Sequence, residues 1–174
     1  MKTIEINVYS FNELSDDAKQ NAIEQYRENH YGFFWSDDYF DSAKKCLDIF
    51  NAKLIDYSID WSNFSGCHWK IDVDDVEDVE DVYEYLDSKY YKQYINGEKH
   101  PSGFCADDDF FSAMKELIDN QCKFEGTLKE LLDECLHELF WSACQDYSHQ
   151  ISDEGITETI QCNEYQFTED GNIY

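Results

Sequence analysis

The chain has 174 residues and carries 39 Asp and Glu against 13 Lys and Arg, which gives a formal net charge of −26 at pH 7. Its apolar fraction of 42%, with 17% aromatic residues, excludes a disordered acidic tail and predicts one acidic globular domain over residues 1–174. The charge disfavours direct nucleic-acid binding, because no basic stripe is present to neutralise phosphates, and it disfavours contact with acidic lipids.

The first predicted elements are a strand over 3–9, where every second residue is apolar, and two amphipathic helices. Ser15 and Ser36 are the expected N-caps of these helices, and two acids follow each of them in the first turn. Alternating residues over 53–61 and 67–73 then predict an antiparallel hairpin with a five-residue loop.

A long helix is expected from Asp74 or Asp75 to about Tyr94, and a further helix over 107–121. Thr127 and Glu130 match a capping box that opens a helix to about Ser148. Ser152 caps a last helix, and 164–168 is predicted to be a closing strand. Together these elements predict an α+β fold, with a small antiparallel sheet of about four strands packed with about six helices.

No motif in the sequence indicates a reaction, so we expect a protein that is not an enzyme and has no cofactor or metal. The acidic run does not match an EF-hand, because it has no glycine at the sixth loop position. His137-Glu138 resembles the start of a zinc-protease motif, but Trp141 stands where the second His is required. The seven cysteines are odd in number and form no Cys-x-x-Cys pair, which favours reduced thiols. No run of apolar residues is long enough to span a membrane, and the first residues lack the apolar centre of a signal peptide, so a cytoplasmic location is expected.

The most acidic segment, 72–84, predicts a helix with apolar residues on one face and carboxylates on the other. A solvated helix face explains such a run when it is taken alone. The total charge favours a second interpretation, since 26 charges equal those on ~44 Å of duplex DNA. We therefore predict an anionic partner-binding surface, which in the segment 72–84 includes Asp74, Glu77, Asp78, Asp81 and Glu84. Outside that segment it includes Asp37, Asp38, Asp107, Asp108 and Asp109.

Segments at both ends of the chain resemble a family of small acidic bacteriophage proteins. Residues 9–19, 22–27 and 35–44 are similar to the opening of that family, and 152–154, 158–160 and 163–171 are similar to its end. The resemblance covers about a third of the chain and leaves the acidic segment unmatched. It implies a phage or prophage origin and action inside a bacterium, and it supplies no catalytic residues.

Charge and resemblance together predict an acidic DNA mimic that blocks the nucleic-acid-binding groove of a basic host defence protein. A CRISPR effector is the preferred target, which would make the protein an anti-CRISPR, and a restriction enzyme inhibited by the same mimicry is an alternative. An antitoxin-like or regulatory protein-binding module is a further alternative, as is a cation-binding protein or enzyme. Homodimer formation is left open.

Overall fold

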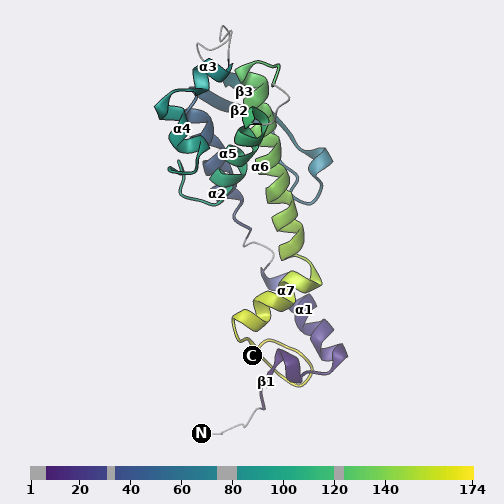
Figure 1. Cartoon of the computed structure of the whole chain (residues 1–174). Helices are drawn as coiled ribbons and strands as arrows, with labels where there is room; N and C mark the ends of the chain where they lie inside the picture. The colour runs from purple at the N-terminus through teal and green to yellow at the C-terminus, as the bar shows by residue number, and fades with distance from the viewer. Residues whose placement is uncertain (1–6, 31–33, 74–81, 120–123) are drawn as a thin grey trace, which may run out of the picture. The chain divides into compact units, whose positions relative to one another are not determined.

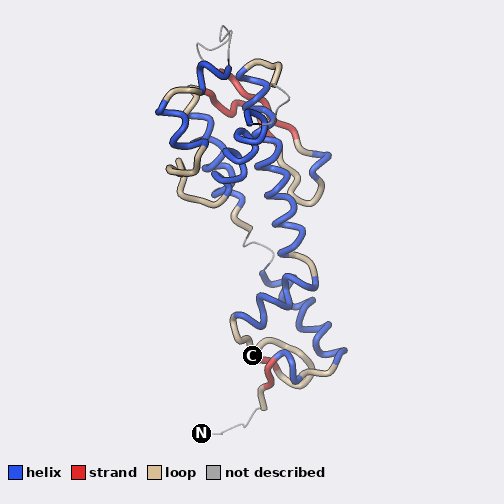
Figure 2. The backbone as a smooth tube through the Cα atoms, viewed as in Figure 1, coloured by secondary structure: helices blue, strands red, loops and turns tan. Residues whose placement is uncertain are grey.

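The computed structural model describes residues 7–30, 34–73, 82–119 and 124–174. The α+β prediction is confirmed, since the described residues form seven α-helices and two antiparallel sheets of two strands each (Figure 2). Backbone packing divides the chain into two compact units, residues 1–34 with 147–174 and residues 35–146. The expectation of a single domain stays a prediction, because two packed units can unfold together or separately.

The first unit is built from segments at opposite ends of the chain. Its elements are β1 (Tyr9–Ser10), the 3₁₀ turn η1 (Phe11–Glu13), α1 (Asp16–His30), α7 (Asp153–Cys162) and β4 (Gln166–Phe167). β1 pairs antiparallel with β4. Most of the strand predicted over 3–9 lies outside the described residues, and the described strand is confined to Tyr9–Ser10.

The core of the first unit forms where α1 meets α7 and the β1–β4 pair. Small residues on α1 allow close packing. Gly171 closes the unit, because its φ of +85° is a conformation that glycine adopts readily and because a Cβ there would lie 2.0 Å from the Ala18 carbonyl oxygen. The buried core residues are Phe11, Leu14, Ala18, Ala22, Ile23, Ile156, Ile160 and Phe167.

The described residues of the second unit form a hairpin and the α-helices α2 to α6 (Figure 1). Helices α2 and α5 pack against each other, and α2 also covers β2. The elements are α2 (Ser36–Asp48), β2 (Ala52–Ser58), η2 (Phe64–Gly66), β3 (His68–Val73), α3 (Val82–Leu86), α4 (Lys89–Ile95), α5 (Ala106–Asp119) and α6 (Leu128–Gln150), the last as far as Asp146.

The core of the second unit is aromatic and aliphatic. Phe50, Phe110, Met114 and Phe140 are fully buried, and the side of α6 that faces inward is a continuous row of apolar residues. Burying each side chain of this size stabilises the folded state by roughly 1.5–3 kcal/mol. This packing fixes the rotation of α5 and α6, so it decides which of their side chains remain at the surface.

The hairpin is confirmed, but its connection differs from the expected five-residue loop. β2 and β3 pair from Ala52 opposite Val73 to Ser58 opposite His68, with an irregularity between Leu54 and Asp56. The connection covers residues 59–67 and contains η2. The Asp60 carboxylate accepts hydrogen bonds from the Ser62 backbone N–H (3.1 Å) and hydroxyl (2.7 Å), which turns the chain before Trp61 could extend the strand.

The single long helix expected as far as Tyr94 is wrong in its described part. The chain forms α3 and α4 in its place, with a break at Asp87 and Ser88. Ser88 has an extended backbone, and its hydroxyl accepts from the Tyr91 N–H at 3.4 Å, so it caps a new helix. The first half of the expected helix, residues 74–81, lies outside the described residues.

Caps elsewhere follow the sequence closely. The Ser15 hydroxyl accepts from the Ala18 N–H, and Ser152 accepts from the Gly155 N–H at 3.1 Å. The capping box at Thr127 is confirmed by reciprocal hydrogen bonds with Glu130. Ser36 is the exception, because α2 begins one residue earlier than expected and has Trp35 at its N-cap.

Candidate functional site

The acids predicted to bind a partner do not share one environment. Asp37 and Asp38 are exposed in the first turn of α2, and Glu84 is exposed on α3. Asp74, Glu77, Asp78 and Asp81 lie outside the described residues. Of the five acids predicted to form the anionic surface in segment 72–84, only Glu84 lies within the described residues.

Three consecutive acids at the start of α5 have three different roles. Asp107 is 0% exposed, and its carboxylate accepts hydrogen bonds from the Ser42 hydroxyl and from the N–H groups of Ser102 (2.8 Å) and Gly103 (3.1 Å). It therefore does not contribute to the exposed surface to which we had assigned it. Asp108 is exposed and lies 3.1 Å from the ring of His100.

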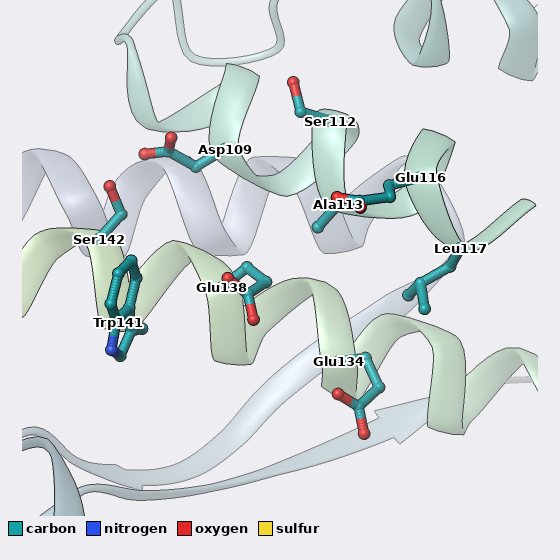
Figure 3. A pocket seen from close by; sticks show the side chains of 9 residues that line it. All are labelled: Asp109, Ser112, Ala113, Glu116, Leu117, Glu134, Glu138, Trp141 and Ser142. Carbon is teal, nitrogen blue, oxygen red and sulfur yellow. The ribbon is translucent and has the colours of Figure 1, made fainter. Parts of the chain in front are cut away.

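Asp109, the third of these acids, lies in a groove between α5 and α6 (Figure 3). The groove encloses about 390 Å³. It is lined by Asp109, Ser112, Ala113, Glu116 and Leu117 of α5 and by Glu134, Glu138, Trp141 and Ser142 of α6. Four of these nine residues are acidic and none is basic.

The helical periodicity of both elements produces this arrangement. On α6, Glu134, Glu138 and Trp141 have the spacing i, i+4 and i+7 and so lie along one side of the helix. On α5, Asp109 and Glu116 are seven residues apart and belong to the lining contributed by the other helix (Figure 3). Other sides of both helices are buried in the core, which leaves these acids at the surface.

The groove is electrostatically negative enough to perturb its own residues. Burial raises the pKa of Asp109, and the nearby charges of Asp146, Asp108 and Glu138 raise it further. A hydrogen bond from the Ser142 hydroxyl across the groove acts in the opposite direction. Ionised Asp109 is therefore held in a place where a positively charged group would be favoured.

Two lysines of the same unit pair with carboxylates outside the groove. Lys45 pairs with Asp41 at 2.7 Å on α2, and Lys92 pairs with Asp87 at 2.6 Å beside α4. Both cations are thus placed against acids that do not line the groove. Among the groove carboxylates, Glu138 lies 3.2 Å from the ring nitrogen Nδ1 of His137, the residue before it on α6.

Trp141 gives the groove an aromatic wall. Its side chain is 46% exposed, although it belongs to a helix whose neighbouring residues Phe140 and Ala143 are fully buried. An indole beside carboxylates suits a guanidinium or ammonium group, which gains about 0.5–2 kcal/mol from the ring face as well as the ionic attraction.

The polar part of the groove lining consists of carboxylates and hydroxyls. The groove has serine hydroxyls but no histidine in its lining to activate them. Among the described residues, no group of three or more His, Cys, Asp or Glu is placed so that it could hold a metal ion. None of the helices in this part of the chain combines the length and apolar character needed to cross a bilayer.

Sequence reasoning identified Asp109 but missed Glu116, Glu134, Glu138 and Trp141. Trp141 was considered only as the residue that interrupts a zinc-binding motif. A usable signal was present on α6, where two acids and a tryptophan share one side of the helix. The contribution of α5 could not be found in this way, because it depends on how two separate helices pack.

Comparison with protein-family models, curated proteins and solved structures gives no match for this chain.

Proposed function

We propose that the protein is a phage-encoded, non-enzymatic inhibitor that imitates DNA and occupies the nucleic-acid-binding groove of a basic host defence protein. The observation that carries this proposal is the groove between α5 and α6, which is lined by four carboxylates and an exposed indole and by no basic residue. The net charge of −26 supplies the long-range attraction for such a partner.

The charge spacing on α6 supports the mimicry. Glu134 and Glu138 are separated by four residues, which corresponds to about 6 Å along the helix axis. One strand of DNA carries a phosphate every ~3.4 Å of axis. The acids of α5 form a second row on the other helix, so lysines and arginines that normally bind phosphates would meet two rows of negative charge, more widely spaced than phosphates.

Trp141 supplies the anchor that charge alone lacks. Rim carboxylates mainly accelerate association and set its salt dependence, whereas a partly buried tryptophan at an interface contributes to the lifetime of the complex. We therefore assign Glu134, Glu138 and Glu116 to attraction and orientation, and Trp141 to retention of the partner.

The class of target follows from the resemblance of the chain ends to acidic phage proteins. Such a protein would act in the cytoplasm of a bacterium, where CRISPR effectors and restriction enzymes are the basic DNA-binding defences. We propose a CRISPR effector as the target, which would make the protein an anti-CRISPR, with a restriction enzyme as the alternative target of the same groove.

DNA protection provides the direct test. Purified CRISPR effectors and restriction endonucleases are each mixed with the protein before their DNA substrate is added, at low and at high salt. We expect protection of the substrate from one nuclease, weakened by salt. The double substitution Glu134→Gln and Glu138→Gln should weaken protection about tenfold or more, because it removes two groove charges without changing side-chain size.

A matched control comes from α1. Glu24 and Glu28 are also exposed and four residues apart, so Glu24→Gln with Glu28→Gln changes the net charge equally at another place. It should leave protection nearly unchanged. Equal loss in both double variants, or no protection from any nuclease of either class, would overturn the proposal.

Exposed aromatic residues outside the groove support a second candidate, an antitoxin-like or regulatory module. Trp35 is 60% exposed and Tyr90 is 51% exposed. If that function holds, Trp35→Ala should abolish partner binding while the groove variant binds normally.

A further inference from the structure

Two cysteines from separate elements of the second unit meet at one backbone carbonyl. Cys67 lies at the end of η2, and its Sγ is 3.4 Å from the carbonyl oxygen of Asp60. Cys144 lies on α6, and its Sγ is 3.7 Å from the same oxygen. Two thiols that share an acceptor are neighbours in space, although 76 residues separate them in the chain.

The two sulfurs differ in their access to solvent. Cys144 is only 3% exposed, whereas Cys67 is half-buried. Burial raises the pKa of the Cys144 thiol to about 12, and the charge and hydrogen bond of Cys67 add to this effect. The interaction between the two thiols is therefore direct, and a reagent in solution reaches Cys67 first.

We propose that Cys67 and Cys144 form a redox modification site, at which a hydroperoxide converts the two thiols into a disulfide that joins the β2–β3 connection to α6. Neither residue lines the groove between α5 and α6. This site is therefore independent of the proposed inhibition and can be tested without a partner.

The chemistry proceeds in two steps with hydrogen peroxide as the oxidant. The Cys67 thiolate attacks one peroxide oxygen, so that an S–O bond forms, the O–O bond breaks and hydroxide leaves. The Cys144 sulfur then attacks the Cys67 sulfur, forming the S–S bond and breaking the S–O bond. The Cys144 proton goes to the departing oxygen. Overall, two thiols and one peroxide give one disulfide and two waters.

The geometry explains why Cys144 acts second. A buried thiol with a raised pKa is a poor nucleophile toward a solvent oxidant, but it is already beside the Cys67 sulfur when the sulfenic acid forms. Because Cys144 is held beside Cys67, the second step is intramolecular and does not need the high concentration that a separate thiol would need. Cys67 is thus the attacked residue and Cys144 the resolving residue.

The remaining described cysteines provide internal comparisons. Cys46 and Cys135 are also close enough to influence one another, but both are 0% exposed, so peroxide does not reach either sulfur. Cys105 and Cys162 are exposed and lie in different units. They report general thiol reactivity without forming the same bond.

The test uses the whole reduced protein treated with one equivalent of hydrogen peroxide, then alkylated and digested. We expect a mass loss of about 2 Da before digestion and a cross-linked peptide pair that contains Cys67 and Cys144. Cys67→Ser should abolish the cross-link, and Cys46→Ser should leave it unchanged. In Cys144→Ser, the sulfenic acid at Cys67 should persist and react with dimedone.

A second measurement does not depend on any variant. The disulfide constrains the unfolded chain, so the oxidised protein should melt about 5–10 °C above the reduced protein, and a phosphine reductant should reverse the shift. The proposal would be overturned if Cys67 and Cys144 were alkylated to the same extent with and without peroxide while Cys105 and Cys162 became oxidised. A cross-link that forms only between molecules would also overturn it.

Discussion

Replacing Asp107 with alanine tests whether a carboxylate from an acidic run holds the second unit together. Asp107 is fully buried and fastens the segment before α5 to α2. Its oxygens accept from the Ser42 hydroxyl, the Ser102 hydroxyl (2.7 Å) and N–H (2.8 Å), and the Gly103 N–H (3.1 Å). The substitution removes every one of these acceptors.

The expected loss of stability follows from the donors left behind. The two hydroxyls can rotate toward other acceptors, but the two backbone N–H groups cannot. Each unsatisfied donor costs about 1–3 kcal/mol, and hydrogen bonds to a charged acceptor lie at the upper end of that range. Asp107→Ala should therefore lower the free energy of unfolding by about 3–5 kcal/mol, which corresponds to a melting temperature roughly 6–20 °C lower.

Urea denaturation followed by fluorescence measures this change, with calorimetry as a second readout. Asp107→Asn keeps one oxygen for the backbone donors and should lose about half as much stability. Asp108→Ala removes an equal charge from the neighbouring exposed position and should change stability by less than about 0.5 kcal/mol. Equal effects at Asp107 and Asp108 would refute the reasoning.

Two further predictions concern the backbone and the groove. Gly171→Ala should lower the free energy of unfolding, measured by urea denaturation, by more than about 2 kcal/mol, because it adds a clash with the Ala18 carbonyl to the cost of a positive φ. Gly97→Ala is the control: its φ is +70° but the space around it is open, so it should cost only about 1 kcal/mol. The raised pKa of Asp109 means that its contribution to stability is fullest below the unfolded value of about 3.9 and is lost as pH rises through the higher folded value. Asp109→Asn should therefore gain stability relative to the native protein between pH 4 and pH 7, and a difference that does not vary with pH would contradict this.

The sequence was most informative where structure depends on neighbours along the chain. The caps at Thr127 and Ser152, and the pairing of the two hairpin strands, need only local hydrogen bonds and alternation. The break at Ser88 was missed because the apolar spacing of Val82 and Leu86 continues into α4 as if one helix were present.

The site depended on contacts between distant parts of the chain and was correspondingly hard to predict. Asp107, Asp108 and Asp109 are the same residue type in a row, and only the packing of α2, α5 and α6 makes one of them buried, one exposed and one part of a groove. Composition indicated a surplus of carboxylates and left open whether they gather in space. It could not indicate that Glu116 would line the same groove as Glu134 and Glu138.

The pairing of Tyr9 with Phe167 has a consequence for biosynthesis. The first strand leaves the ribosome long before its partner is translated, so α1 must wait with its apolar stripe, including Ala22 and Ile23, in contact with water. Residues 35–146 emerge before the C-terminal segment 147–174 and pack among themselves. The nascent chain therefore matures from its middle outward, and the net negative charge of the chain as a whole keeps neighbouring copies apart in the meantime.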